Sequence, residues 1–233
     1  MKLLFAAVEQ NVVQRWQDYF ELVADPEYPV DSDEFYLRFD RDQLALCRGT
    51  DRRGIRVDDS ETRSRLRGKF ALGQACGSPR TGMTVLDATA GLGTDLLSLY
   101  ARGYQVSACE RHPVLWALID SYLLARGFSA IDLRLVDAVE VLADQPAEVF
   151  DVIYLDPMFP EHRKKALPGK AMQYLRDLLP AQEQDVGLLL ESARRVATDR
   201  VVLKRRGRDT IIGNPDWQVA GSTVRYDVYR PLA

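Results

Sequence analysis

Short apolar runs alternate with longer amphipathic segments from residue 83 onward. The apolar runs predict strands, which cover residues 84–88, 105–110, 133–137, 149–155 and 200–204. The intervening pattern predicts helices over residues 94–102 and 113–126, ended by Gly103 and Gly127, and further helices between 166 and 196. With a closing pair of strands near 217–220 and 223–229, this order predicts an α/β fold, a mostly parallel sheet with helices on both faces.

The first 80 residues follow a different pattern. A helix is predicted around residues 12–23, before the prolines at positions 26 and 29, and short strands are predicted over 35–39 and 44–48. A loop that contains glycine and proline, residues 77–82, precedes the first strong strand. We therefore predict a small N-terminal α+β section over residues 1–80 and a second domain over residues 81–233.

Composition excludes several classes of protein. The three cysteines share no metal-ligand spacing, so we predict no metal site. No secretory signal and no apolar run long enough to span a membrane is found, which predicts a cytoplasmic protein.

Charge argues against a protein that coats nucleic acid without selectivity. Such affinity comes mainly from neutralising phosphates, and the net charge of the chain is −3. Basic residues are nevertheless clustered within 52–69, 162–170 and 200–208. Each cluster is either a solvated surface or a contact for a polyanion, and the second directly follows the motif at residues 156–159.

Acidic residues stand at the ends of four predicted strands: Asp87, Glu110, Asp137 and Asp156. In a parallel sheet the carboxyl ends of the strands share one edge, and ligands bind there. Glu110 could accept both ribose hydroxyls of an adenosyl ligand, and Asp137 could accept a hydrogen bond from an adenine amino group. The joint pattern predicts a site for S-adenosyl-L-methionine.

Two glycines lie in the turn between the first strand and its helix. At Gly91 and Gly93 the lack of a Cβ atom lets a ligand approach the backbone closely. A dinucleotide-binding loop would carry a third glycine, but Leu96 stands there. This difference argues against a dinucleotide-dependent oxidoreductase, which is the first alternative function.

The catalytic candidates follow the apolar strand at residues 149–155. The Asp156 carboxylate and the Pro157 carbonyl are acceptors that suit an amino group of low basicity, and Phe159 could stack on an extruded base. Pro157 also restricts Asp156 to an extended conformation. We predict that these residues serve the methylation of an exocyclic amino group of a nucleobase. The residues alone do not choose among guanine N2, adenine N6 and cytosine N4.

Two of these motifs resemble those of a known family. Residues 86–95 resemble the first motif of class I methyltransferases, which have a Rossmann-like fold, and residues 156–160 resemble the loop of amino-group methyltransferases. Met158 replaces the second proline of the general loop pattern. Together with Glu110, Arg111 and residues 201–205, the motifs are similar to those of the RsmJ family, and the resemblance covers residues 55–230.

The RsmJ family methylates a guanine N2 of 16S ribosomal RNA in the small subunit. The resemblance therefore implies this RNA as partner, within an assembled or partly assembled subunit, and no DNA. The N-terminal section would be a candidate for RNA contact. In addition to Asp87, Gly91 and Gly93, the resemblance implies donor contacts from Thr94, Asp95, Glu110, Arg111, Asp137, Ala138 and Asp156.

Two other functions remain open at this point. A DNA adenine methyltransferase would share the motif at residues 156–159, and only the family resemblance argues against it. A non-catalytic RNA-binding protein could keep the fold, but it would have no need of acidic residues at four strand ends. Failure to bind the methyl donor would favour the non-catalytic RNA-binding protein.

Overall fold

The structure is a computed structural model that describes residues 1–31, 33–58, 60, 70–144, 150–157, 169–179 and 185–232. The chain divides into two compact units, each of which combines segments that are distant in sequence. Unit 1 contains Met1–Val57, Pro113–Phe128 and Phe159–Glu183. Unit 2 contains Asp58–His112, Ser129–Met158 and Gln184–Ala233.

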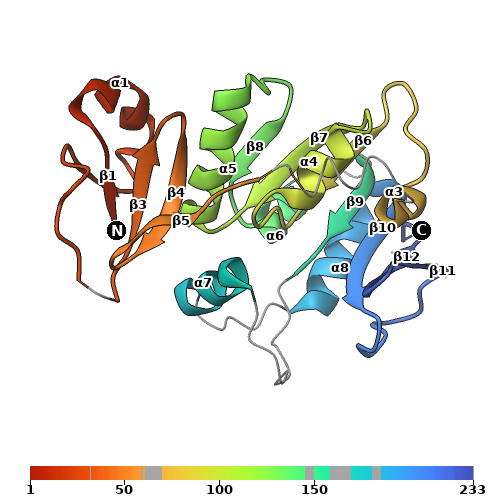
Figure 1. The fold of residues 1–233 in the computed structure, drawn as a ribbon. Coiled ribbons are helices and arrows are strands. Elements are labelled where there is room, and N and C mark those ends of the chain that lie inside the picture. Colours follow the sequence, from red (N-terminus) through yellow and green to blue (C-terminus); the bar gives the residue numbers. More distant parts are fainter. Residues whose placement is uncertain are drawn as a thin grey trace. The chain divides into compact units, whose positions relative to one another are not determined.

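Unit 1 is built on a five-stranded sheet with the order β2-β1-β3-β4-β5 (Figure 1). Strand β1 is parallel to β2 and β3, whereas β3, β4 and β5 pair in antiparallel fashion. The predicted strands at 35–39 and 44–48 are confirmed as β3 and β4. The bounds are β1 Lys2–Leu4, β2 Glu21–Val23, β3 Phe35–Asp40, β4 Gln43–Arg48 and β5 Asp51–Ile55.

The helix predicted around residues 12–23 is wrong over most of its length. Two short helical turns, α1 (Gln10–Val13) and η2 (Gln14–Trp16), follow η1 (Ala7–Glu9) and extend only to residue 16, and residues 21–23 form strand β2. Residue Glu21 pairs with Lys2 of β1, so backbone pairing in the sheet overrides the local helical pattern. Trp16 is fully buried at the end of η2, where its indole nitrogen donates to Asp120 at 2.9 Å.

Two later helices complete unit 1. Helix α5 (Pro113–Arg126) has the predicted bounds and packs on β4, where the Leu44 amide donates to the Ser121 hydroxyl at 3.0 Å. Helix α7 (Lys170–Leu178) contacts β5, because the Tyr174 hydroxyl donates to the Asp51 carboxylate. The segments that interrupt unit 2 in the sequence are thus structural parts of unit 1.

Unit 2 contains a seven-stranded sheet with the order β11-β12-β10-β9-β6-β7-β8. Strands β6 to β10 are mutually parallel, and β12 pairs in antiparallel fashion with both β10 and β11. The predicted α/β fold with a mostly parallel sheet is confirmed. The bounds are β6 Thr84–Asp87, β7 Gln105–Glu110, β8 Asp132–Leu135, β9 Phe150–Leu155, β10 Ala197–Arg206, β11 Trp217–Ala220 and β12 Val224–Tyr229.

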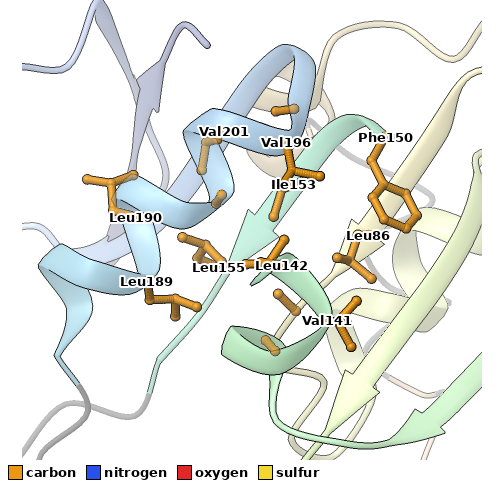
Figure 2. Close-up of a cluster of buried hydrophobic side chains, with 14 of the residues drawn as sticks. Leu86, Val141, Leu142, Phe150, Ile153, Leu155, Leu189, Leu190, Val196 and Val201 are labelled. Atoms are coloured by element: carbon orange, nitrogen blue, oxygen red, sulfur yellow. The ribbon is translucent and has the colours of Figure 1, made fainter. Parts of the chain in front are cut away.

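Helices cover both faces of this sheet. Helices α6 (Ala138–Asp144) and α8 (Val186–Val196) pack on one face, where Ile153, Leu155 and Val201 contribute to the apolar core (Figure 2). Successive side chains of a strand point to opposite faces, so Tyr154 and Lys204 point the other way. That second face carries α3 (Ala71–Cys76), which packs on β10, β11 and β12, and α4 (Thr94–Tyr100), which packs on β7. In the part of the chain that the structure describes, no helix is long and apolar enough to cross a membrane.

Candidate active site

Three of the predicted acidic residues meet at the edge of unit 2 where the parallel strands end, which we call the carboxyl edge. Asp87 is the last residue of β6, Glu110 is the last of β7, and Asp156 directly follows β9. Strand β6 lies between β7 and β9 in the sheet. The structure therefore brings these three residues together, as the strand pattern predicts.

Asp137 is placed differently from the prediction. Strand β8 ends at Leu135, and Asp137 directly precedes helix α6, where its carboxylate accepts from the Val139 amide at 2.9 Å. Asp137 thus caps a helix that the sequence pattern did not predict. Its other carboxylate oxygen lies 3.7 Å from the Arg111 guanidinium. Ala138, the first residue of α6, is buried in the apolar core.

The loop between β6 and α4 contains two glycines in a left-handed backbone conformation. Gly91 and Gly93 have φ angles of +59° and +76°, in the left-handed region that favours glycine. A Cβ atom on Gly91 would meet no atom closer than 3.9 Å, so backbone strain, rather than crowding, requires a glycine there. Thr94 and Asp95 form the first turn of α4.

Glu110 fastens this loop to the end of β7. One of its carboxylate oxygens accepts from the Gly91 amide and the other from the His112 amide, both at 2.8 Å. Burial raises the pKa of Glu110, although the two backbone amides act in the opposite direction. The buried carboxylate is therefore fixed in direction and retains lone pairs for a further donor.

Lys204 connects Asp95, at the start of α4, with Asp156, which follows β9. From β10, its ammonium donates to Asp95 at 2.7 Å and to Asp156 at 2.8 Å, and Asp95 also accepts from the Tyr154 hydroxyl at 2.6 Å. Burial alone would lower the pKa of Lys204, but Asp95 and Asp156 outweigh it, so the net shift is upward. The lysine is therefore a firmly protonated cation among carboxylates.

Thr89 forms a second link between the glycine loop and the catalytic strand. Its amide donates to the Asp87 carboxylate at 3.1 Å, and its hydroxyl accepts from the Asp156 amide at 2.6 Å. Burial raises the pKa of Asp87, and the bond from Thr89 acts in the opposite direction. The backbone at Asp156 is therefore held directly by the loop that would carry the donor.

Of the two other predicted catalytic residues, the structure describes Pro157 but not Phe159. Pro157 is buried directly after Asp156. Phe159 lies outside the described residues, as do Met158 and the basic residues at 162–165. Within the described part of the chain, no group of histidine, cysteine and acidic side chains is arranged to hold a metal ion.

Sequence reasoning missed the roles of Lys204, Thr89 and Tyr154. Lys204 was grouped with the basic residues at 200–208, although it ends an apolar run at the same sheet edge as the acidic residues. The position of Lys204 at the end of an apolar run could have indicated that it lies in the site. Arg205 of the same cluster is also buried, with 7% of its surface exposed, so this cluster is not a uniform solvated face.

The residues at the carboxyl edge fit S-adenosyl-L-methionine. The donor is a cation with a ribose and an adenine, and the edge presents buried carboxylates beside a turn that a side chain would strain. Glu110 ends β7 and Asp95 lies in the first turn of α4, so both carboxylates lie beside the glycine loop.

Comparison with known proteins agrees with this geometry. A family model described as SAM-dependent methyltransferase matches residues 15–231. The chain is 39% identical to ribosomal RNA small subunit methyltransferase J of Alkalilimnicola ehrlichii, over 88% of this chain and 86% of that protein. It is 34% identical to the protein of the same name from Pseudomonas aeruginosa, over 94% and 90% of the two chains.

A solved structure supports the same assignment. The crystal structure of a SAM-dependent methyltransferase from Neisseria gonorrhoeae has a TM-score of 0.73 and 26% identity, and the match covers 99% of this chain and 96% of that one. Fold, carboxyl edge and sequence identity all agree with the predicted family. The chain belongs to the SAM-dependent methyltransferase family that includes ribosomal RNA small subunit methyltransferase J.

Proposed function

We propose that this protein transfers a methyl group from S-adenosyl-L-methionine to the exocyclic N2 of a guanine in 16S ribosomal RNA of the small subunit. The single observation that supports this most is the position of Asp156. Its carboxylate lies at the carboxyl edge, its amide is bound by Thr89 of the glycine loop, and its side chain is about a third exposed at 36%. An acceptor there can meet both a donor on the loop and an incoming amino group.

The chemistry requires little more than positioning and charge stabilisation. When bound, S-adenosyl-L-methionine supplies an electrophilic methyl group. The lone pair of a guanine amino group is delocalised into the ring, so the amino group must be held in line, and near-attack positioning contributes about 7–11 kcal/mol. Asp156 and the Pro157 carbonyl accept hydrogen bonds from the amino group and offset the positive charge that develops on nitrogen. Phe159 would stack on the extruded base.

The donor contacts are assigned to the other residues of the edge. Glu110 would accept from the ribose, and Asp137, beside Arg111 and Ala138, would serve the adenine. Gly91 and Gly93 would let the donor approach the backbone, with Thr94 and Asp95 at its amino-acid part and Asp87 fixing the loop. These roles rest on position and on the family, and the substitutions described in the Discussion test them.

The RNA substrate is assigned from the named relatives and from the charge of the chain. The relatives at 39% and 34% identity are ribosomal RNA small subunit methyltransferases by name. A net charge of −3 gives weak general attraction to phosphates, so shape and ribosomal context would add to recognition. We therefore expect assembled or partly assembled subunits, in the cytoplasm, to be better substrates than naked RNA. The section at residues 1–80 is the candidate for additional RNA contact.

Nucleoside mass spectrometry tests this proposal. The protein is incubated with labelled donor and with small subunits, naked 16S ribosomal RNA or duplex DNA, and the labelled nucleoside is identified. The expected product is N2-methylguanosine, formed most rapidly on the subunits. Label in N6-methyladenosine or N4-methylcytidine would refute the proposed base, and label in DNA would refute the proposed partner.

A further inference from the structure

Lys204 of β10 reaches the acidic residues of the carboxyl edge. The register pairs Val202 with Tyr154 and Leu203 with Leu155, so Lys204 lies beside Asp156 on the neighbouring strand. Its side chain is 19% exposed and its ammonium contacts both Asp95 and Asp156. One ammonium therefore bridges two carboxylates from different parts of the site.

Several other titratable groups surround the ammonium. They are Asp95 from α4, Tyr154 from β9, Asp156 directly after β9, Asp87 from β6 and Tyr226 from β12, and Cys76 of α3 interacts with Asp95 and Asp87. Among these residues Lys204 is the only cation, whereas three are carboxylates. Carboxylates so close together cannot all remain ionised unless a positive charge offsets their repulsion.

We infer that Lys204 is a positioning residue for methyl transfer, which holds the Asp156 carboxylate ionised and directed toward the amino group by bridging it to Asp95. This inference rests on the proposed function, in which Asp156 accepts hydrogen bonds from the substrate. A protonated Asp156 would turn one of its two acceptor oxygens into a donor and would lose the negative charge that offsets the positive charge on the amino nitrogen. Lys204 itself is a cation and cannot serve as the base.

The bridge joins residues from the two parts of the site. Asp95 lies at the start of the helix that follows the glycine loop, and Asp156 directly follows strand β9. One ammonium therefore links the residue assigned to the donor with the residue assigned to the base, and all three side chains belong to unit 2.

The test removes the charge of Lys204 and follows the pH dependence of the single-turnover rate at saturating donor. Lys204→Met and Lys204→Gln should move the acidic limb of the rate profile upward by about 1–3 pH units, because the two carboxylates then share a proton. Lys204→Arg should leave the limb near its wild-type position. The double variant K204M/D95N should bring it back toward wild type, since one of the two repelling charges is gone.

A second readout needs neither donor nor RNA. In the ligand-free Lys204→Met variant the pKa values of Asp95 and Asp156 should lie above those of the unfolded chain. Stability gained from such groups is present at low pH and lost as pH rises through the raised pKa. The deficit in melting temperature relative to wild type should therefore grow from about pH 4 upward.

Arg80→Met is the matched control. Arg80 pairs with Asp151 at the opposite end of β9, at 3.1 Å, so this variant removes a cation from an aspartate of the same strand. Its acidic limb should not move. Calorimetry should show that Lys204→Met binds the cationic donor within about threefold of wild type, since ion pairs of its acceptors have been removed rather than the acceptors themselves.

The outcomes separate the two proposals. An acidic limb that stays in place in both Lys204→Met and Lys204→Gln would overturn the positioning role, as would an equal shift in Lys204→Arg. Label in a nucleoside other than N2-methylguanosine would overturn the proposed substrate, while the pH comparison could still be made on that nucleoside. If Lys204→Met fails to fold, Lys204→Gln and Lys204→Arg still carry the comparison.

Discussion

Strand β9 carries an aspartate near each of its ends, and the two have opposite surroundings. Asp151, near the amino end, accepts from the Thr84 amide at 2.8 Å and from Arg80 at 3.1 Å. These contacts, led by the Thr84 amide, lower the pKa of Asp151. Asp156, beyond the carboxyl end, accepts from Lys204 together with Asp95 and lies near the buried Asp87.

The difference shows how the sheet separates stability from function. At the amino end Asp151 accepts hydrogen bonds from the nearby Thr84 amide and Arg80, as expected of a structural residue. At the carboxyl edge several carboxylates lie close together, and two of them, Asp87 and Glu110, have raised pKa values because of burial. A cluster of buried acids is costly for folding, and it provides acceptors for a cationic donor and an amino group.

The largest expected effect comes from removing the aspartate at the carboxyl edge. Asp156→Ala should lower the single-turnover rate about 10²–10³-fold, as for loss of one preorganised electrostatic partner. Donor affinity should change far less, because the carboxylate acts mainly on the amino group in the transition state. Rapid-quench measurements at saturating donor would show the rate, and calorimetry the affinity.

Asp151→Ala is the matched control for that experiment. It should leave the rate close to wild type and cost about 1–3 kcal/mol of folding stability, because the Thr84 amide loses its acceptor. A near wild-type rate for Asp156→Ala, or a large loss of rate for Asp151→Ala, would abolish the distinction between the two ends of β9.

The donor site should show the next largest effect. Glu110→Ala should weaken donor binding by about 1.5–3 kcal/mol, since the ribose would lose a charged acceptor. Gly91→Val should be more harmful, because a β-branched residue is strained at a φ of +59° in the loop that Glu110 fastens. Calorimetry with the purified variants tests both. Unchanged donor affinity in the two variants would contradict the assignment of the donor site to this loop.

The pH dependence of stability should have opposite signs at the two ends. The pKa of Glu110 is raised from 4.5, so its contribution to stability is complete below that value and is lost as pH rises through the folded-state pKa. The pKa of Asp151 is lowered from 3.8, so its contribution is complete above 3.8 and is lost as pH falls.

Two isosteric variants separate these contributions. Glu110→Gln should remove part of the decline in melting temperature that accompanies rising pH in the weakly acidic range. Asp151→Asn should remove part of the decline that accompanies falling pH below about 4. The slopes come from thermal unfolding of the ligand-free protein, and equal slopes in the two variants would contradict the assignment.

The smallest effect is expected from the basic residues that follow Asp156 in the sequence. Changing Arg163, Lys164 and Lys165 to glutamate should weaken RNA association and flatten its salt dependence, since each lost phosphate contact removes about 0.9 or less from the logarithmic slope. Arg80→Glu, near the amino end of β9, is the control and should leave the slope unchanged. An unaltered slope in the triple variant would show that these three residues do not contact RNA phosphates.

The strands of unit 2 could be predicted because each is a short apolar run between breakers. Helix α5 could be bounded from Pro113 and Gly127, but its packing on β4 could not be predicted, because nothing in the helix sequence identifies the surface on which it packs. The helix predicted around residues 12–23 failed because pairing of Glu21 with Lys2 is a tertiary contact. Asp137 lies two residues beyond its strand because it caps α6.

The acidic half of the site was predictable and the cationic half was not. Carboxylates at strand ends form a repeated pattern that can be read along the chain. Lys204 has no such pattern, and its partner Asp95 is 109 residues away in sequence. From the sequence alone, a lysine among arginines is interpreted as part of a surface cluster. The sheet order places β10 next to β9 and thereby brings Lys204 to Asp156.

The most direct test of the central claim is made in cells that lack the gene for this protein. Mass spectrometry of their 16S ribosomal RNA should reveal one N2-methylguanosine missing, which wild-type protein and Asp151→Ala restore and Asp156→Ala does not. A complete set of methylated guanines in the absence of the gene, or restoration by Asp156→Ala, would contradict the claim.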